Sequence, residues 1–389
     1  MSKLNELINE LCPDGVVLKP LFKLVTINTP SIKILSKNIL ITGDYPVINQ
    51  GSDYISGYTN DKTALFPKNE YIIFGDHTEI IKYVDFPFAQ GADGIKILTS
   101  KNINCKYLYY CFVNFYKTTG KYTRHWSAAK NTLIPFPPLP VQEEIVRILD
   151  KFTELTAELT AELTARKQQY KYYRDSILTY DESIKIELGQ IATVTKLAGF
   201  EFTKYVSYSD SGKVIALRGL NVKNGHLDLK DVKYIDNSDL SKLTRSKLHI
   251  GDMLFTYVGT IGQVALVNEE DRFYLAPNVA LIRTTTDKLM PKFMRYYFQS
   301  SQFLKTQIDR LLQSSSMQNI PMWKIRKFKI PVPPLAEQQR IVDILDHFDR
   351  LCNDISEGLP AEIESRQKQY EYYRDKLLTF KKKEAAENE

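Results

Sequence analysis

The sequence predicts a mixed α/β protein of the α+β type, with two globular domains joined and separated by two long antiparallel helices in a pseudo-two-fold arrangement. Three observations predict this fold class. Ten of the sixteen residues from 135 to 150 are identical to those from 331 to 346, so the chain contains a long internal repeat. Each copy continues into a segment with helical periodicity. The sequence before each copy has short apolar runs bounded by Gly, Asp and Asn, which are typical of strands.

The repeat divides the 389 residues into five segments. The charged tail lacks apolar residues that could anchor it, so we expect it to be frayed. In chain order, the predicted segments are a first globular domain at 1–134, a proline-rich entry and helix at 135–180, a second globular domain at 181–330, a second entry and helix at 331–380, and the tail at 381–389.

Each repeated segment is predicted to form one long helix behind its prolines. A residue that precedes a proline is pushed out of the helical region, so the helices are expected to begin near Leu139 and Leu335. Apolar residues recur at steps of three or four from Ile145 to Leu163, which predicts an amphipathic helix of about forty residues, roughly 60 Å long. A compact domain does not need so long a helix for its own core. This favours antiparallel pairing of the two helices over the alternative that each helix only covers its neighbouring domain.

The middle of the first helix consists of consecutive Glu-Leu-Thr-Ala units at 154–165. Between the matched Asp and Tyr there are 20 steps in the first copy (150 to 170) and 24 in the second (346 to 370), so the helices are expected to differ by one unit. Four residues add about 6 Å and a net turn of about 40°, and one base pair of B-DNA adds about 3.4 Å and about 34–36°. The units therefore suggest a ruler, and slippage of a repetitive gene is the alternative. The Gly-Leu-Pro sequence at 358–360 predicts a kink or short break.

The two globular domains are predicted to share one fold with different surfaces. Strand-like runs with a Gly-Asp pair occur at 71–76 and at 250–255, and tyrosine-rich helical segments follow at 107–110 and 293–298. Such a pair is expected of two reading domains with different targets. Candidate reading residues are polar or basic residues on loops, where side chains can reach base edges. Each of them taken alone is better explained as a solvated loop residue, and only the clusters support reading. The candidates in the first domain are Asn49, Gln50, Tyr58, Thr59, Asn60, His77, Thr78, Lys121, Arg124, His125, Trp126 and Lys130. Those in the second domain are Arg218, Asn221, Lys223, Asn224, Tyr257, Thr260, Asn278, Ser315, Gln318 and Asn319.

Two further features suggest contacts with other molecules. The basic residues at 324, 326, 327 and 329 could contact phosphate, although a solvated strand edge explains them nearly as well. Each helix closes on a Tyr-x-Tyr-Tyr-Arg-Asp sequence whose aromatic residues point to two sides. One side could face the other helix and the second side a partner subunit, unless the neighbouring domain covers it. The candidate docking residues are Tyr172, Arg174, Tyr372 and Arg374.

Composition and missing motifs narrow the function. The 52 basic and 46 acidic residues give a net charge of +6, which is compatible with a polyanionic partner without requiring one. The dinucleotide, phosphate-loop and amino-methyltransferase motifs are missing, and the histidines have no metal-ligand spacing. A carboxylate group around Gly75–Lys82 is better explained as a strand-end turn than as a nuclease site. The scattered cysteines and the lack of a signal peptide or apolar span predict a soluble cytoplasmic protein. A catalytic methyltransferase or nuclease and a purely structural coiled-coil protein are the alternatives to a non-catalytic reader.

Together the proline-rich entry, the Gln-x-x-Ile-Val-x-Ile-Leu-Asp run, the Glu-Leu-Thr-Ala units and the Tyr-x-Tyr-Tyr-Arg-Asp sequences resemble the specificity subunit of type I restriction–modification enzymes, the IC class above all. This resemblance implies that each domain is a target-recognition domain that reads one half of a bipartite, asymmetric site in double-stranded DNA through the major groove. The helices would set the gap and bind two modification subunits that carry S-adenosylmethionine and methylate adenine. ATP-dependent restriction and translocase subunits would join them. The chain itself would bind no cofactor or metal and would have no catalytic residue.

Overall fold

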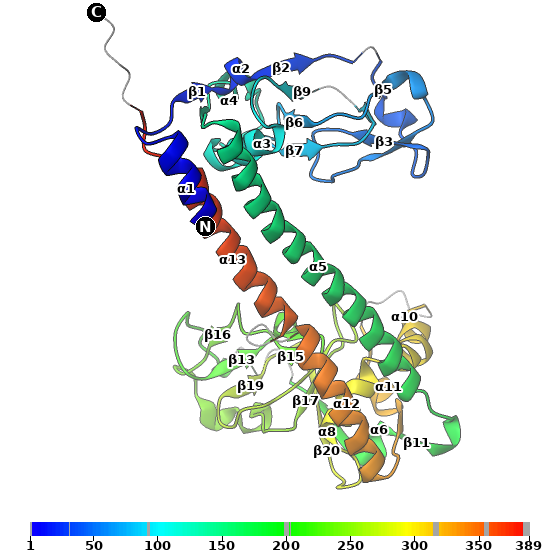
Figure 1. The fold of residues 1–389 in the computed structure, drawn as a ribbon. Helices are drawn as coiled ribbons and strands as arrows, with labels where there is room; N and C mark the ends of the chain where they lie inside the picture. Colours follow the sequence, from blue (N-terminus) through cyan, green and yellow to red (C-terminus); the bar gives the residue numbers. More distant parts are fainter. Residues whose placement is uncertain are drawn as a thin grey trace, which may run out of the picture. The chain divides into compact units, whose positions relative to one another are not determined.

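A computed structural model of the protein describes residues 2–30, 32–91, 94–197, 202, 204–313, 319–353 and 358–383. The chain forms two compact units, one made of residues 1–160 and 363–389 and the other of residues 161–362. Each unit therefore contains one globular domain and a stretch of both long helical segments (Figure 1). This division cuts across the linear segments expected from the repeat, because a folded unit draws on both copies.

The first unit is built on two four-stranded sheets, the two-stranded antiparallel sheet β1-β10 and several short helices. One four-stranded sheet is antiparallel and has the strand order β2-β9-β6-β7, and the other has the order β4-β3-β8-β5, in which β3 and β8 run parallel. The strands are β1 (Leu18–Pro20), β2 (Val25–Asn28), β3 (Tyr45–Ile48), β4 (Gly57–Thr59), β5 (Leu65–Phe66), β6 (Tyr71–Gly75), β7 (Ile81–Val84), β8 (Phe88–Gln90), β9 (Ile95–Ser100) and β10 (Leu133–Pro135). The helices are α1 (Ser2–Leu11), α2 (Leu21–Leu24), α3 (Cys105–Phe115) and α4 (Trp126–Ala129), with 3-10 turns η1 (Ser36–Asn38) and η2 (Lys62–Ala64).

The second unit repeats this plan. Its main antiparallel sheet has the order β12-β20-β17-β18, and its second sheet, β16-β13-β19, again contains a parallel pair, β13 and β19. The strands are β11 (Lys185–Glu187), β12 (Ala192–Lys196), β13 (Ile215–Leu217), β14 (Val222–Lys223), β15 (His226–Leu227), β16 (Lys233–Tyr234), β17 (Met253–Thr256), β18 (Val264–Leu266), β19 (Phe273–Leu275), β20 (Val279–Thr284) and β21 (Lys329–Pro331). The helices are α6 (Leu188–Ile191), α8 (Pro291–Phe298), α9 (Ser301–Phe303), the π-helix η7 (Leu304–Asp309), α10 (Arg310–Gln313) and α11 (Met322–Arg326), and the 3-10 turns are η3 (Glu182–Ile184), η4 (Gly219–Asn221), η5 (Leu240–Lys242) and η6 (Thr244–Ser246).

The shared strand order confirms that the two domains have one fold, and it corrects one of the motifs used to predict it. The central strands β6 and β17 are buried along their whole length, as expected for strands covered on both faces. Gly75 is the last residue of β6 and Asp76 follows it, whereas Gly251 and Asp252 both precede β17. The two Gly-Asp pairs therefore lie at opposite ends of corresponding strands, and a dipeptide common in turns gave a false alignment.

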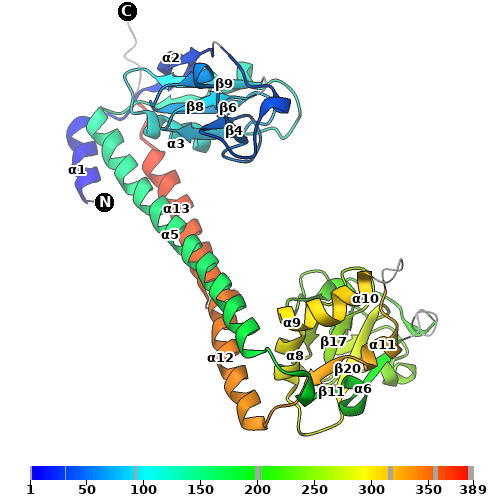
Figure 2. The same ribbon diagram turned by 90° about the vertical axis from the view of Figure 1, so that its right-hand side faces the viewer.

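Both long helical segments begin where their prolines predicted. Helix α5 is continuous over Leu139–Ile177, and the second segment forms α12 (Leu335–Asn353) and α13 (Leu359–Leu378). The break predicted at 358–360 is present, with Gly358 outside either helix. Residues 354–357 lie outside the described part of the chain. Figure 2 shows α5, α12 and α13 from the side.

The helices pair in the antiparallel direction within each unit. In the first unit the ring of Phe152 stacks on that of Tyr373 with centroids 5.4 Å apart. In the second unit Tyr173 stacks on Phe348 at 5.7 Å. Helix α5 has 39 residues and α12 and α13 have 19 and 20, so the helical segments contain equal numbers of described helical residues. Since residues 354–357 lie outside the described part of the chain, the expectation that the helices differ in length by one repeat unit stays a prediction.

A buried glutamine connects the start of each long segment to its domain. Gln142, only 1% exposed, accepts a hydrogen bond from the backbone N–H of Asn104 at 2.8 Å and donates one to the carbonyl oxygen of Pro137 at 2.6 Å. Asn104 is the N-cap residue of α3, and its side chain accepts a bond from Tyr107 N–H. One amide side chain thus joins the proline-rich entry to the first turn of a domain helix.

Gln338 does the same in the second unit. Its Oε1 accepts from the N–H of Met290, the residue that precedes α8, at 2.8 Å. Its Nε2 donates to the carbonyl oxygens of Lys288 and Pro333, both at 2.7 Å. The glutamine shared by the two copies is thus a structural link that satisfies buried backbone groups.

A matched aspartate makes the second link. Asp150 accepts hydrogen bonds from Lys106 Nζ at 2.8 Å and from the Tyr110 hydroxyl at 2.6 Å, both on α3. Asp346 accepts them from Lys292 Nζ at 2.7 Å and the Tyr296 hydroxyl at 2.6 Å, both on α8. The tyrosine-rich helices therefore hold the last residue of each Ile-Leu-Asp run.

The first three tail residues are ordered against the beginning of the chain, contrary to the expectation of a frayed tail. The N–H of Val16 bonds the carbonyl oxygen of Lys381 at 2.8 Å, and the N–H of Lys383 bonds that of Val16 at 3.1 Å. Gly15 has φ +97°, and a Cβ at this position would lie 2.4 Å from the Lys381 oxygen. Backbone pairing, which does not depend on apolar side chains, explains the order. Residues 384–389 lie outside the described ranges.

The buried amide of Gln338 predicts a large loss of stability on replacement by methionine. Gln338→Met leaves one backbone N–H and two carbonyl groups without their partner, which costs about 3 kcal/mol in total. Unfolding of the second unit by urea can be followed through Trp323 in a Trp126→Phe background. Gln339→Met is the control, since Gln339 is exposed and bonds only Asp343. Equal midpoints for the two variants would contradict the assigned role.

Candidate nucleic-acid interface

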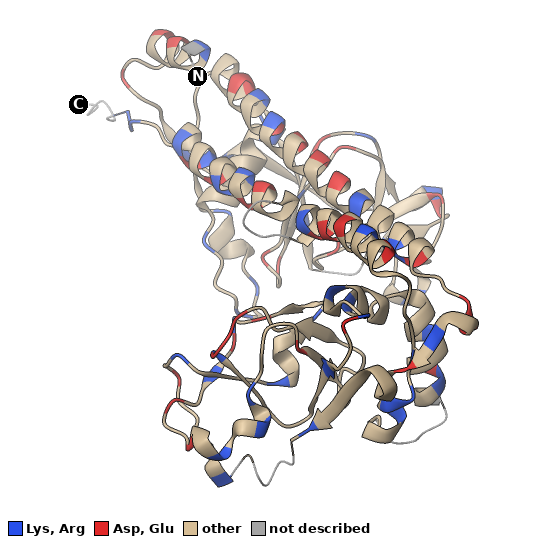
Figure 3. Ribbon diagram, turned by 90° about the horizontal axis from the view of Figure 1, so that it is seen from below, with Lys and Arg blue, Asp and Glu red and all other residues tan. Residues whose placement is uncertain are grey.

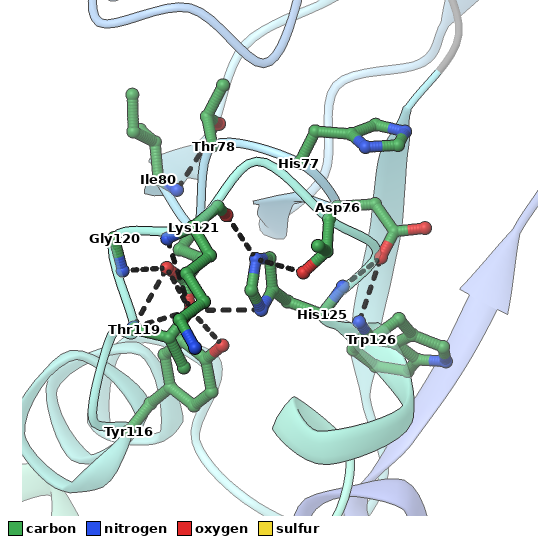
Figure 4. Close-up of polar contacts among 12 residues, drawn as sticks. Asp76, His77, Thr78, Ile80, Tyr116, Thr119, Gly120, Lys121, His125 and Trp126 are labelled. Carbon is green, nitrogen blue, oxygen red and sulfur yellow. Dashed lines mark hydrogen bonds and ion pairs between the residues drawn. The ribbon is translucent and has the colours of Figure 1, made fainter.

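In the first unit, a single buried carboxylate joins two loops that carry candidate reading residues. Glu79, in the turn between β6 and β7, accepts hydrogen bonds from the Tyr116 hydroxyl at 2.6 Å and from the N–H groups of Thr119 and Gly120 at 2.9 and 2.8 Å (Figure 4). The Nδ1 atom of His125 lies 3.3 Å from the same carboxylate. Residues 116–125 are thereby tied to the β6–β7 turn.

The hydrogen bonds determine the charge state of Glu79. Burial by itself would raise the pKa of this carboxyl, but the bonds from Tyr116, Thr119 and Gly120, together with His125, lower the pKa to about 2. Glu79 has φ +60°, a left-handed conformation that is uncommon for a residue with a side chain. The ionised form of Glu79 therefore holds the loop.

Asp76 supplies a second attachment for the same loop. Its Oδ1 accepts from the N–H groups of His125 at 3.0 Å and Trp126 at 2.8 Å (Figure 4). The neighbouring Lys82 is buried and donates to the carbonyl oxygens of Asn49 and Asp53. Asp76, Glu79 and Lys82 thus stabilise a strand-end turn, as the sequence indicated. Within the described residues, no group of three or more His, Cys, Asp or Glu could hold a metal ion.

The two attached loops present a small exposed surface. Lys121 and Arg124 are exposed, and the Tyr122 side chain is 80% exposed. The ring of Tyr122 stacks on that of His77 at 5.2 Å. The Nδ1 atom of His77 is buried without a hydrogen-bond partner in the described structure. Exposed cations and an exposed aromatic ring are groups that can contact phosphates and bases.

Other candidates of the first domain support the loops instead of facing outward. Gln50 accepts a bond from the N–H of His77, and its carbonyl oxygen accepts one from the Thr78 hydroxyl at 2.6 Å. Asn49 accepts from the N–H of Gly51. The His125 ring is buried, with Nε2 2.7 Å from the carbonyl oxygen of Lys121. These residues position the loops.

The remaining candidates of the first domain lie elsewhere or are partly covered. Trp126 begins α4 and packs its ring on Phe74. Tyr58 and Thr59 are in β4, and Thr59 is buried. The side chain of Asn60 accepts a bond from the N–H of Asp44. Lys130 is exposed after α4. The expectation of a free loop side chain is therefore wrong for His125 and Thr59.

The second unit joins its candidate residues at the corresponding turn, between β17 and β18. The N–H of Ile320 bonds the carbonyl oxygen of Tyr257 at 2.9 Å, and Asn319 forms a bridge with Val258. The Thr256 hydroxyl bonds the carbonyl oxygen of Thr260. Thr260, Asn278 and Asn319 are exposed. These residues form a loop surface like that of the first unit, and Ser315 and Gln318 lie outside the described residues.

Tyr257 lies in this loop cluster, but its side chain is only 8% exposed. Burial raises its pKa, and a hydrogen bond with the backbone N–H of Asn278 offsets part of this effect. Tyr257 therefore positions the Asn278 turn, where Asn278 has φ +70°, and its predicted freedom as a loop residue is wrong.

Four candidates of the second domain lie in the loop at 218–224, where Asn224 N–H also bonds the Gln263 side chain at 3.0 Å. Asn221 is fully buried and caps the backbone: its amide donates to the carbonyl oxygens of Asp228 and Asp231 at 2.8 and 2.7 Å. Arg218 pairs with Asp231, and Lys223 with Asp228. Asn224 is exposed with φ +50°. The expectation that Asn221 is an accessible reader is therefore wrong, because its polar atoms satisfy the chain itself.

The sequence indicated that Asp76 and Glu79 belong to a strand-end turn, but not that they hold the first loop. Their bonded partners lie 37 to 50 residues away along the chain, so a local pattern cannot report them. The available signal was that acidic residues occur within a strongly apolar strand-turn-strand segment.

The docking candidates differ from one another in exposure. Tyr172 and Tyr372 are 71% and 61% exposed. Arg174 pairs with Asp175 and lies 5.5 Å from the ring of Tyr170. Arg374 pairs with Asp375 and packs on the ring of Tyr370. The two tyrosines are thus available to a partner, while the arginines brace the helices.

Charges of both signs are interspersed along the long helices (Figure 3). None of the helices in the described ranges combines the length and apolar character that crossing a membrane requires. The protein thus consists of two domains of one repeated fold, and each domain holds polar loops at the corresponding turn. This arrangement is typical of two-domain recognition proteins.

Comparison with known proteins identifies the family. The family model described as "Type I restriction modification DNA specificity domain" matches residues 14–166 and 180–365. The Type I restriction enzyme EcoR124I/EcoR124II specificity subunit of Escherichia coli is 34% identical, over 100% of this chain and 99% of that protein. The chain therefore belongs to the type I restriction–modification DNA specificity family. Like the other specificity subunits it is a non-catalytic component of such a system.

Solved structures show the same fold. The S subunit of a type I restriction–modification system from M. genitalium superposes with a TM-score of 0.58 at 15% identity, covering 93% of this chain and 96% of that one. A chain from a study of complex assembly and conformational transition of the type I R-M system gives a TM-score of 0.56 at 15% identity, with coverage of 95% and 98%.

The charge on Glu79 predicts a pH-dependent loop attachment. Glu79→Gln places an amide against N–H donors and is expected to cost about 2–3 kcal/mol near neutral pH. Because folding lowers the pKa of Glu79, its contribution is present above the unfolded pKa of about 4.5 and is lost as the pH falls towards 2. The stability difference between parent and variant should therefore shrink over that range.

Limited trypsin digestion at neutral pH provides a local measurement for the same variant. Cleavage after Lys121 and Arg124 should be faster in Glu79→Gln than in the parent. Glu70→Gln is the control, because the Glu70 side chain is exposed and accepts a hydrogen bond from the Tyr83 hydroxyl, away from the 116–125 loop. Unchanged cleavage in Glu79→Gln would show that the loop does not depend on this carboxylate.

Proposed function

We propose that this chain gives a type I restriction–modification complex its recognition of a bipartite, asymmetric DNA site, with each domain reading one half. The observation that carries this proposal is that the two units share one strand order while their corresponding turns carry different side chains. His77, Lys121 and Arg124 lie on one surface, and Thr260 and Asn319 on the other. Equal scaffolds with unequal loops fit two different half-sites on one duplex.

The loop chemistry supports reading from the major groove. Arginine and lysine can donate to guanine O6 and N7, and asparagine can form paired bonds with adenine. Arg124 and Lys121 are exposed on a loop that Glu79 and Asp76 hold in place. A preorganised loop loses less conformational entropy on binding than a free one, which favours affinity and specificity.

The partners follow from the same assignment. We propose that two modification subunits dock on the helical segments, with the exposed Tyr172 and Tyr372 among their contacts. S-adenosylmethionine would be bound by those subunits and used to methylate adenine, while ATP would be used by restriction and translocase subunits. We therefore expect the complex to act on the chromosome in the cytoplasm. The side chains of Arg174 and Arg374 would act indirectly by holding the tyrosine-bearing turns.

Mapping methylated adenines across the host genome tests the half-site assignment. Deleting the gene should abolish methylation at one bipartite motif. The double variant Lys121→Ala/Arg124→Ala should relax or abolish recognition of one half of that motif, because two cationic donors are lost; each such contact is worth about 1–3 kcal/mol of discrimination.

The matched variant for the other domain is Thr260→Ala/Asn319→Ala, and it should affect the opposite half. If both double variants altered the same half, the assignment of one half-site to each domain would be refuted. If the gene deletion left every methylated motif in place, the proposed function as a whole would fail.

The Glu-Leu-Thr-Ala units of α5 are proposed to set the length of the unspecified gap. Deletion of residues 158–161 removes about 6 Å of helix and a net turn of about 40°, which corresponds to one to two base pairs in rise and about one in rotation. The methylated motif should then keep both halves and lose about one base pair of its gap. Replacement of residues 158–160 by Ala, which makes the whole unit Ala because residue 161 is already Ala, is the control and should leave the gap unchanged. A changed half-site with the old gap would reject the ruler.

A further inference from the structure

The second unit has a basic groove that the reading loops do not account for. The groove is a hollow of about 510 Å³ between η7 and α10 on one wall and α11 and β21 on the other. Trp323, on α11, is 55% exposed and lines it together with Arg310, Lys324 and Lys327. We call this hollow the Trp323 groove. Figure 2 shows α10 and α11 in the second unit.

Most of the positive charges that line the Trp323 groove have no ion pair in the described structure, and Glu182, a carboxylate that also lines it, pairs with Lys185 at 2.7 Å. Lys324 Nζ and Lys327 Nζ lie 5.6 and 5.3 Å from the centroid of the Trp323 ring. Over the described ranges, Arg310, Lys324 and Lys327 have no ion pair, whereas Lys329 at the edge of the groove pairs with Glu187. An indole ring stabilises nearby cations without cancelling their charge. The groove thus keeps a set of cations ready for an anion.

The first unit shows that the fold does not require this groove. Strands β10 and β21 correspond in the two units, and Leu133 of β10 matches Lys329 of β21. Counting back from this pair, residue by residue, aligns α4 of the first unit with α11 of the second. By this correspondence Ser127, Ala128 and Asn131 stand in the first unit where Trp323, Lys324 and Lys327 stand in the second. The aromatic and basic side chains are therefore an addition to one domain, and packing does not explain them.

Helix α11, which forms part of one wall of the Trp323 groove, follows the candidate interface residues of the second unit closely in the sequence. Helix α11 begins three residues after Asn319, which bridges to the β17–β18 turn. Arg326 on α11 donates to the carbonyl oxygen of Val194 in β12 at 2.8 Å. Two residues further along β12, Lys196 Nζ lies 5.8 Å from the ring of Tyr257. Basic side chains thus connect the reading loops with the groove.

The geometry points to the Trp323 groove as a binding site for the sugar–phosphate backbone of duplex DNA beside the half-site that the second domain reads. Lys324, Lys327 and Arg310 contact phosphate oxygens there, and the indole N–H of Trp323 supplies a further donor. Contacts of this kind position the protein and carry no sequence information. Continuity with the reading loops favours DNA over an acidic protein surface as the occupant. The inference rests on the proposed function, because it extends the DNA contact of the same domain.

The first unit provides the variant for the test. The triple variant Trp323→Ser/Lys324→Ala/Lys327→Asn introduces residues that the corresponding turn already tolerates. The control Lys242→Ala/Lys288→Asn removes the same charge from exposed lysines that have no ion pair in the described structure. Both full-length variants are purified with their partner subunits. Binding to duplex DNA that carries the methylated motif is then measured from about 50 to 200 mM salt.

The triple variant should reduce the slope of log K against log salt by about 2, since each lost phosphate contact changes it by about 0.9. The methylated motif and its gap should stay the same, and the control should keep the parent slope. An unchanged slope in the triple variant, an equal reduction in the control, or a changed motif would overturn the proposal. Loss of partner subunits from the triple variant with an unchanged slope would show instead that the groove binds protein. A parent complex with no salt-dependent DNA binding would refute the proposed function itself.

Discussion

The anchoring of each long helical segment to its domain is the interaction on which the rest of the structure depends. Gln142 and Gln338 each join a proline-rich entry to the first turn of a domain helix, and Asp150 and Asp346 repeat the attachment further along. A glutamine suits the first position because its amide both accepts and donates, so it satisfies an N–H and a C=O that are buried together. Two attachments, rather than one, fix the direction in which each helix leaves its domain.

Both units have the same glutamine and aspartate anchors, and they differ in the contacts that surround those anchors. The second unit adds a network in which Asp349 contacts His226 at 2.8 Å and Arg295 at 3.4 Å. Burial alone would raise the pKa of Asp349, but His226 and Arg295 lower it below its ordinary value. In the first unit Thr153 stands at the matching helix position, and its hydroxyl bonds the carbonyl oxygen of Leu149. The network holds the β14–β15 hairpin to α12, an attachment specific to one domain.

Patterns of a few neighbouring residues predicted the boundaries of the long helices. The hydrogen-bond partners of buried polar groups, which lie far away along the chain, could not be predicted from the sequence. The prolines before Leu139 and Leu335 located both helix starts, and Pro360 located the break. The roles of polar loop residues were harder to predict. The side-chain amide of Asn221 donates to backbone carbonyl groups of its own loop, but its sequence neighbours do not distinguish it from an exposed asparagine. The role of Glu79 depends on N–H groups that folding brings to it. A local motif cannot report such a partner.

The repeated units of α5 lie where this helix contributes least to a buried core. Each four-residue unit turns the helix by a net 40° or so, and inserting units therefore rotates its apolar stripe. Leu155 is 37% exposed, and the repeat region of α5 includes no residue of the buried core, so rotation there forfeits little buried area. Most buried residues of α5 lie nearer its start, where Gln142 joins this segment to its own domain, as Gln338 does for the second segment. A change in the number of units therefore costs little burial and leaves both anchors intact.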